Sequence, residues 1–225
     1  MTEKHTLRSF DEALEALSAR TLAMGEDVTG MVEKAGEIFQ AQDVDNAKRL
    51  VEHDLDIDRQ HDGINAAVVD VLARLHPVAR DLREVLAARH IAANLERVAD
   101  HAKGIAKRSI ANATPSVSPG TAGILRELHA GVVRALQNIL RALKDGNPEL
   151  ADQVRRNDAQ LDQLYDDLFH MVIAVLRTSP DTALGEVQAL FVGKSLERIG
   201  DHATNIAEEI RFMTKGDLPT ATREM

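Results

Sequence analysis

An eight-residue motif occurs twice in the chain, and the two copies lie 101 residues apart. The first copy, Leu-Glu-Arg-Val-Ala-Asp-His-Ala, occupies residues 95–102, and the second, Leu-Glu-Arg-Ile-Gly-Asp-His-Ala, occupies residues 196–203. The offset is close to half of the 225 residues, which indicates an internal duplication. The fold must therefore be one that half of the chain can form and the other half can repeat.

Apolar residues at steps of three and four predict six long helices, and no segment shows the alternation typical of a strand. Residues near 42–43, the His76-Pro77 pair, residues 145–148 and the Ser179-Pro180 pair interrupt the pattern. The helices are expected at 7–39, 44–75, 79–111, 121–144, 149–177 and 182–214.

Three long helices with short connections favour an antiparallel bundle, and the sequence supplies two such sets. We expect an all-α fold of two tandem three-helix bundles of long antiparallel helices. The first repeat is expected at 1–112 and the second at 121–225, which would include a short C-terminal tail. A segment rich in Pro, Ser and Gly, 113–120, is the expected linker.

The composition narrows the classes of function. A net charge of −9 argues against nucleic acid as the main ligand, because phosphate backbones select basic surfaces. The chain has no cysteine, which excludes disulfides and thiolate metal sites and fits a reducing compartment. No apolar run approaches the roughly 18 residues that cross a bilayer. We expect a cytoplasmic protein without direct membrane insertion.

Each half contains two pairs of carboxylates, and the members of each pair are four residues apart. Four residues make little more than one helical turn, so both members project from the same face. Asp54 and Asp158 fall at apolar positions of their helices, where an ionised carboxylate is unfavourable unless it is paired or binds a metal. The candidate residues are Asp54, Asp58, Glu96 and Asp100 in the first half and Asp158, Asp162, Glu197 and Asp201 in the second.

Four carboxylates on two facing helices form an oxygen-rich group with about four negative charges. Such a group suits hard or borderline cations, which include magnesium, manganese, iron and zinc. Asn205 lies one turn beyond Asp201 and could extend the second site, whereas Gly104 stands at that position in the first half. The two sites are therefore expected to differ in strength.

Motifs for catalysis are missing from the sequence. It has no Gly-rich phosphate loop, no Gly-x-Ser-x-Gly elbow and no His-Glu-x-x-His helix. We therefore expect a protein that is not an enzyme. Two alternatives stay open: a metal-dependent phosphohydrolase, and a purely structural helical bundle with ordinary salt bridges. The second alternative has weight because 36 acidic residues give about six pairs at spacing four by chance.

The duplicated motif resembles the PhoU family of phosphate-specific transport accessory proteins. Two further segments resemble the same family: His76-Pro-Val-Ala-Arg-Asp-Leu-Arg83, and Asp201-His-Ala-Thr-Asn-Ile-Ala-Glu-Glu209. The resemblance covers nearly the whole chain, from Phe10 to about Gly216. It implies two three-helix bundles, a cytoplasmic location and multinuclear clusters of iron or zinc on Glu/Asp-x-x-x-Asp motifs. The matching positions are Glu96, Asp100, Glu197 and Asp201, with Asp54, Asp58, Asp158 and Asp162 as their partners.

The resemblance also implies a role in the cell. Members of the family are negative regulators of the phosphate-starvation response and of phosphate uptake. They are thought to link the ATPase subunit of the phosphate ABC transporter to a phosphate-sensing histidine kinase. Homodimers are common among them. These properties are the expected function and partners of this chain.

Overall fold

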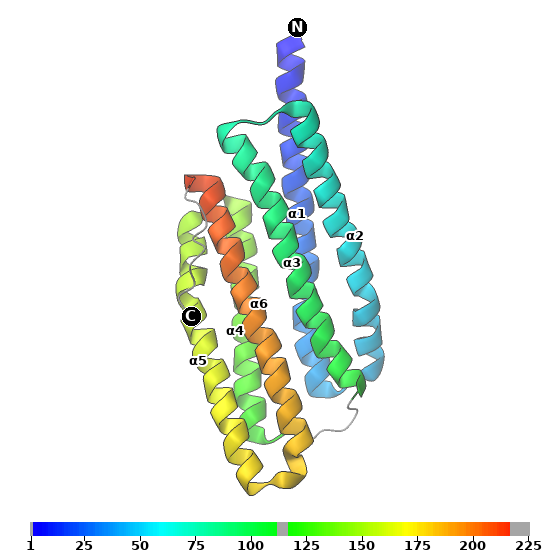
Figure 1. The fold of residues 1–225 in the computed structure, drawn as a ribbon, viewed down its shortest axis with the longest axis vertical. Coiled ribbons are helices and arrows are strands. Elements are labelled where there is room, and N and C mark those ends of the chain that lie inside the picture. The colour runs from blue at the N-terminus through cyan, green and yellow to red at the C-terminus, as the bar shows by residue number, and fades with distance from the viewer. Residues whose placement is uncertain (1, 112–116, 217–225) are drawn as a thin grey trace.

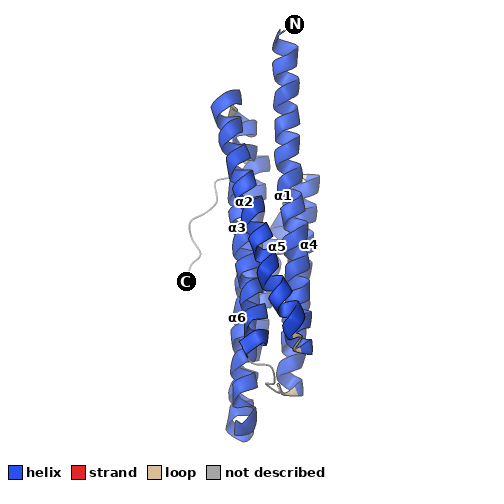
Figure 2. Ribbon diagram, turned by 90° about the vertical axis from the view of Figure 1, so that its right-hand side faces the viewer, coloured by secondary structure: helices blue, strands red, loops and turns tan. Residues whose placement is uncertain are grey.

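The computed structural model describes residues 2–111 and 117–216, and nearly all of these residues are helical (Figure 2). No strand occurs in these two ranges, which confirms the all-α prediction. The elements are α1 (Thr2–Ala41), α2 (Val44–Leu75), α3 (Ala79–Ala111), α4 (Pro119–Asp145), α5 (Pro148–Thr178), the 3₁₀ turn η1 (Pro180–Thr182) and α6 (Ala183–Lys215).

Residues at the helix ends explain why the breaks fall where the sequence predicts them. The Asp43 carboxylate accepts a hydrogen bond from the Asn46 amide at 3.0 Å and caps α2. Gly146 ends α4 with a φ of 58°, a conformation that glycine adopts without strain. Ser118 caps α4 and Pro119 is its first residue, so this helix begins two residues before the expected 121. The remainder of the predicted linker lies largely outside the described residues.

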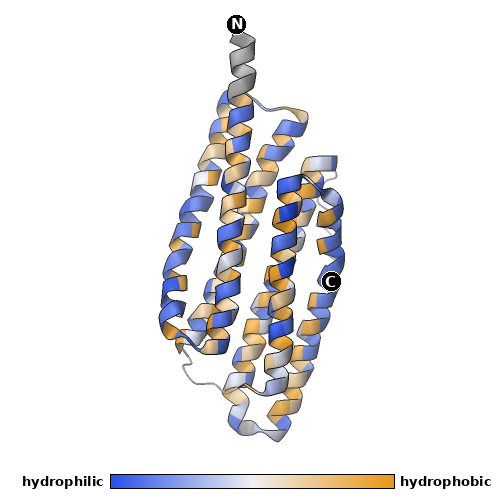
Figure 3. Cartoon of the chain, turned by 180° about the vertical axis from the view of Figure 1, so that it is seen from behind, coloured by the Kyte–Doolittle hydropathy of each residue, from blue (hydrophilic) through white to orange (hydrophobic). Residues whose placement is uncertain are grey.

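Two three-helix bundles lie side by side, as predicted (Figure 1). The first consists of α1, α2 and α3, and the second of α4, α5 and α6. Contacts between α3 and α6 and between α1 and α4 join them. Buried Leu, Ile, Val, Ala and Met side chains of both bundles form one core. Hydrophilic and hydrophobic residues are interspersed along the coloured helices (Figure 3). In the ranges that the structure covers, no helix is long and apolar enough to span a membrane.

Two glycines of α1 allow α4 to approach closely. A Cβ atom on Gly25 would overlap the Leu140 side chain, and a Cβ atom on Gly36 would overlap the imidazole ring of His129. The His129 ring lies over Gly36, and its Nε2 donates a hydrogen bond to the Val32 carbonyl at 3.0 Å. These glycines therefore form recesses for the side chains that join the two bundles.

Helices α3 and α6 pack antiparallel through a polar interface. His90 Nδ1 lies 3.1 Å from Glu209 Oε1 at one end of the interface, and the Arg108 guanidinium lies 4.3 Å from the centre of the Phe191 ring at the other. At the offset of 101 residues, Phe191 is the equivalent of His90, and Glu209 is the equivalent of Arg108. The two contacts therefore occupy equivalent positions in the two halves. The two halves are thus related by an approximate two-fold axis that passes between α3 and α6.

Candidate functional site

The first-half carboxylates come together between α2 and α3. Asp54 is buried, with 3% of its surface exposed, whereas Glu96 and Asp100 are half-buried and Asp58 is exposed. Burial raises the pKa of Glu96, and the negative charges of Asp100 and Asp58 raise it further. Glu96 therefore lies close enough to Asp100 and Asp58 for their negative charges to act on its own.

A lysine that the sequence pattern did not single out lies among these carboxylates. Lys103 Nζ donates hydrogen bonds to Asp54 Oδ2 and, at 2.9 Å, to Asp100 Oδ1. Burial works to lower the pKa of Lys103, but the hydrogen bonds to Asp54 and Asp100 outweigh it and raise the pKa above its usual value. The buried carboxylate of Asp54 is therefore compensated by an ammonium group from the next helix.

The second-half carboxylates lie on α5 and α6 in a different environment. Asp201 is 9% exposed, Glu197 and Asp158 are half-buried, and Asp162 is exposed. Arg198 Nη1 donates to Asp201 Oδ2 at 3.3 Å, and Lys194 Nζ donates to Glu197 Oε1 at 2.8 Å. The other oxygen, Glu197 Oε2, is buried and accepts no hydrogen bond, with Arg198 Nε 3.8 Å away.

Gly200 lets α5 approach α6 at this point. A Cβ atom there would lie 2.9 Å from Leu161 Cδ1 and 3.3 Å from Asp158 Oδ1. A cavity of about 140 Å³ opens beside it, and Asp158, Gly200 and Thr204 line part of its wall. The Thr204 hydroxyl is buried without a hydrogen-bond partner. Thr204 occupies the position that Lys103 occupies in the first half.

The arrangement of the described residues bears on metal binding and on the predicted role of Asn205. In the part of the chain that the structure describes, no three His, Asp or Glu side chains are placed to hold one metal ion. Metal binding by the eight carboxylates stays a prediction. Asn205 does not extend the second site: its amide Nδ2 donates to Asn94 Oδ1 on α3 at 3.2 Å, because it lies on the face of α6 that meets the other bundle.

The histidines that follow the two motif aspartates face each other across the two-fold axis. The rings of His101 and His202 have centroids 5.7 Å apart, and His202 Nδ1 donates to Asn94 Oδ1 at 2.9 Å. Burial, followed by the neighbouring His101, lowers the pKa of His202 to about 4. Burial also lowers the pKa of His101. Both imidazoles are therefore neutral in the folded protein at neutral pH.

Substitution of His202 by Gln is expected to flatten the dependence of stability on pH between 6.5 and about 4. In this window the unfolded chain binds a proton at His202 and the folded chain does not, so the wild type loses stability as the pH falls. Because solvent screens this partly buried ring, the loss is about 1–2 kcal/mol. Urea unfolding at several pH values measures it, with exposed His170→Gln as the control. Parallel curves for the wild type and His202→Gln would contradict the prediction.

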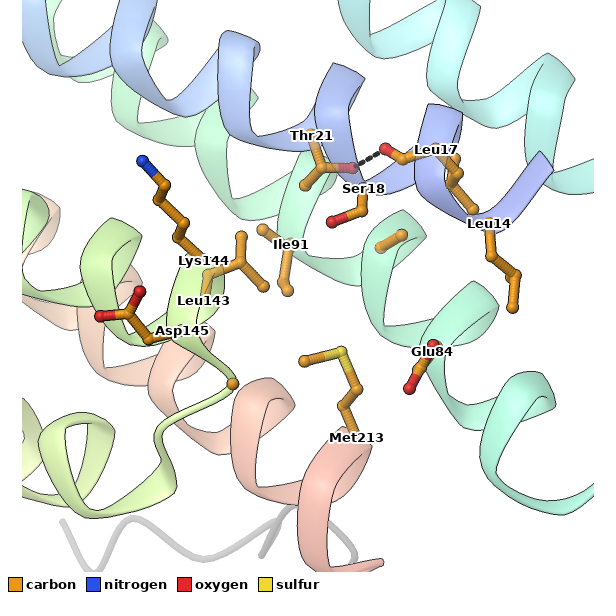
Figure 4. Close-up of a pocket in the computed structure, with 12 residues that line it drawn as sticks. Leu14, Leu17, Ser18, Thr21, Glu84, Ile91, Leu143, Lys144, Asp145 and Met213 are labelled. Carbon is orange, nitrogen blue, oxygen red and sulfur yellow. Dashed lines mark hydrogen bonds between the residues drawn. The ribbon is translucent and has the colours of Figure 1, made fainter. Parts of the chain in front are cut away.

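A second cavity, of about 270 Å³, lies away from the carboxylates, where α1, α3, α4 and α6 meet (Figure 4). None of the eight predicted residues lines it. Its wall is both apolar and polar, and Glu84, which accepts from Arg80 Nε at 2.9 Å, lies on one side. The cavity is therefore separate from the candidate metal sites. Its lining includes Leu14, Leu17, Ile91, Leu143, Met213 and Glu84.

Comparison of the sequence with known proteins gives one consistent result. The PhoU domain model matches residues 21–109 and 125–210, one match in each bundle. A phosphate-specific transport system accessory protein PhoU homolog of Xylella fastidiosa (strain 9a5c) is 37% identical over 220 residues, which cover 98% of this chain and 92% of that protein. The accessory protein PhoU of Escherichia coli (strain K12) is 29% identical over 213 residues, 95% of this chain and 88% of that protein.

Solved structures agree with the sequence matches. The crystal structure of PhoU from Pseudomonas aeruginosa has a TM-score of 0.88 at 29% identity and covers 92% of this chain and 100% of that one. The phosphate transport system regulatory protein PhoU from Streptococcus pneumoniae has a TM-score of 0.85 at 25% identity, with coverage of 93% and 98%. The duplicated motif, the paired bundles and these similarities lead to one conclusion: the chain belongs to the PhoU family.

Proposed function

We propose that this protein is a negative regulator of the phosphate-starvation response and of phosphate uptake. The observation that carries the proposal is similarity over nearly the whole chain to proteins named as accessory to phosphate-specific transport. A structural relative is likewise titled a regulatory protein of phosphate transport. The proposed role is regulatory and not enzymatic.

The proposed partners are the ATPase subunit of the phosphate ABC transporter and its sensor histidine kinase, which this protein would connect in the cytoplasm. The third proposed partner is a second copy of the chain, in a homodimer. An adaptor needs exposed apolar surface for its partners. Large apolar side chains are exposed on the second half of α5 and the first turns of α6, at one end of the second bundle. They are Phe169, Ile173, Leu184, Val187 and Phe191.

Deletion of the gene is expected to switch on phosphate-scavenging genes in phosphate-rich medium. A negative regulator keeps these genes silent when phosphate is plentiful, so its loss removes the repression. A reporter fused to a phosphate-starvation promoter measures the effect, and a plasmid copy of the gene should restore silence. An unchanged reporter in the deletion strain would remove the regulatory proposal.

We also propose that the second-half carboxylates, Asp158, Asp162, Glu197 and Asp201, hold metal ions. The buried oxygen of Glu197 that accepts no hydrogen bond supports this proposal, because Arg198 Nε stays 3.8 Å away and a bound cation would supply the missing contact. Oxygen donors suit iron and zinc, the metals expected from the family, and also magnesium and manganese. A bound ion would neutralise the carboxylates and tie α5 to α6.

Combined substitution of Glu197 and Asp201 by Ala is expected to lower the metal content of the purified protein. Each substitution removes a carboxylate donor, and ligand loss weakens metal binding directly. Elemental analysis after dialysis against the metal measures the content. The control is Glu33→Ala with Glu37→Ala, a pair at the same spacing on α1. Absence of metal from the wild type, under conditions that retain weak binding, would count against the site.

A further inference from the structure

We propose that the Lys103 ammonium group takes the place of a metal ion among the first-half carboxylates, so that bound metal is confined to the second half. The inference deepens the metal binding proposed above and rests on it for the second half. Its first-half part, an internal cation between α2 and α3, rests only on the geometry around Lys103.

The ammonium group is placed where a bridging cation would be needed. Lys103 Nζ contacts Asp54 on α2 and Asp100 on α3, and the Asp54 side chain is only 5% exposed. A metal ion that used both of these carboxylates would have to displace an ammonium group that is already hydrogen-bonded to both. The lysine thus supplies the positive charge that relieves the repulsion, and it does so without leaving the chain.

The second half has a neutral residue at the same place. The position equivalent to Lys103 is Thr204, whose hydroxyl is buried without a partner and adjoins the cavity beside Asp158. Lys194 lies elsewhere: it is two-fifths exposed, donates to Glu197 Oε1, and its Nζ is 5.2 Å from the centre of the Tyr165 ring. It therefore does not take the position in the second half that Lys103 takes in the first.

The guanidinium groups of the two motif arginines, Arg97 and Arg198, do not account for the difference between the halves. Arg97 Nε lies 3.4 Å from Glu96 Oε2, and Arg198 Nε lies 3.8 Å from Glu197 Oε2. Each arginine thus sits next to the Glu of its own motif, on the same helix. Because these contacts with Glu are alike in the two halves, the motif arginines do not distinguish the halves, whereas Lys103 and Thr204 do.

A reciprocal exchange of these two residues tests the inference. Zn²⁺ per chain is measured by elemental analysis after dialysis of the full-length protein against ZnCl₂. Lys103→Thr should open the first half and raise the zinc content about twofold, whereas Thr204→Lys should reduce it about tenfold. Glu96→Ala with Asp100→Ala should leave the zinc content unchanged. A wild-type zinc content in Lys103→Thr would overturn the inference even if Thr204→Lys fails to fold.

Thermal unfolding separates failure of the inference from failure of the metal proposal. In EDTA, Lys103→Thr should melt about 5–10 °C below the wild type, because the buried Asp54 loses its cation. Zn²⁺ should restore much of the lost Tm, since a ligand that binds only the folded state stabilises it. No zinc in any variant would overturn the confinement of metal together with the metal proposal. An unchanged Tm of Lys103→Thr in EDTA would overturn the role of Lys103 alone.

Discussion

Replacement of Glu186 by Leu is expected to lower the free energy of unfolding by about 3 kcal/mol. This carboxylate at the start of α6 is fully buried. One oxygen accepts from the Ser118 amide at 2.7 Å and the other from the Thr121 hydroxyl at 2.6 Å, at the first turn of α4. Leucine would leave the buried Thr121 hydroxyl and the half-buried Ser118 amide without this acceptor.

Glu186→Gln separates lost hydrogen bonds from lost volume. Its side chain keeps one acceptor oxygen and turns an NH₂ group toward the second donor, so we expect about half of the loss. Urea unfolding followed by circular dichroism measures both variants, with the exposed Glu127→Gln on α4 as the control. Loss of less than about 1 kcal/mol in the Leu variant would show that water replaces the carboxylate.

Two glycine substitutions on α1 are expected to change stability in opposite directions. Gly36→Ala should lower the free energy of unfolding by about 2 kcal/mol, because its Cβ displaces the His129 ring and breaks the hydrogen bond to Val32. Gly30→Ala, on the same helix, should raise it by roughly 0.5–1 kcal/mol, since no atom beyond its own stretch of helix lies within 4 Å of the new methyl group. The difference in urea midpoint between the two variants is the measurement.

The pair is its own control, because helix, residue type and substitution are identical and only the neighbours differ. A gain of stability in both variants would mean that His129 moves aside without a loss of free energy of unfolding. The contact between α1 and α4 would then adapt to the added methyl group. Gly25→Ala, which meets the flexible end of Leu140, should fall between the two.

The helices could be predicted from the sequence because each depends on local information. Apolar spacing, Pro77 and the caps at Asp43 and Gly146 act within a few residues along the chain. The three glycines of α1 illustrate the limit. The apolar spacing treats Gly25, Gly30 and Gly36 alike, yet Gly36 receives the side chain of His129 and Gly25 that of Leu140, which lie 93 and 115 residues further along the chain.

The carboxylate groups could be located from spacing and duplication, but their counterions could not. Asp54 was expected to need a partner, and nothing in its own helix identifies it, because Lys103 reaches it from the next helix. A comparison of the two halves contains the signal: Lys103 and Thr204 occupy equivalent positions. Asn205 was misplaced for a similar reason, since its neighbour is Asn94 in the other bundle.

The two-fold relation between α3 and α6 has a consequence for how the halves could diverge. In an interface with two-fold rotational symmetry, each contact occurs twice, once on each side of the axis. This is the isologous kind of interface, which two identical subunits form. Once both copies are fused into one polypeptide, a change in one copy no longer appears in the other. His90 with Glu209 and Phe191 with Arg108 already use different chemistry at matching places. Fusion thus permits one ancestral surface to acquire two separate specialisations.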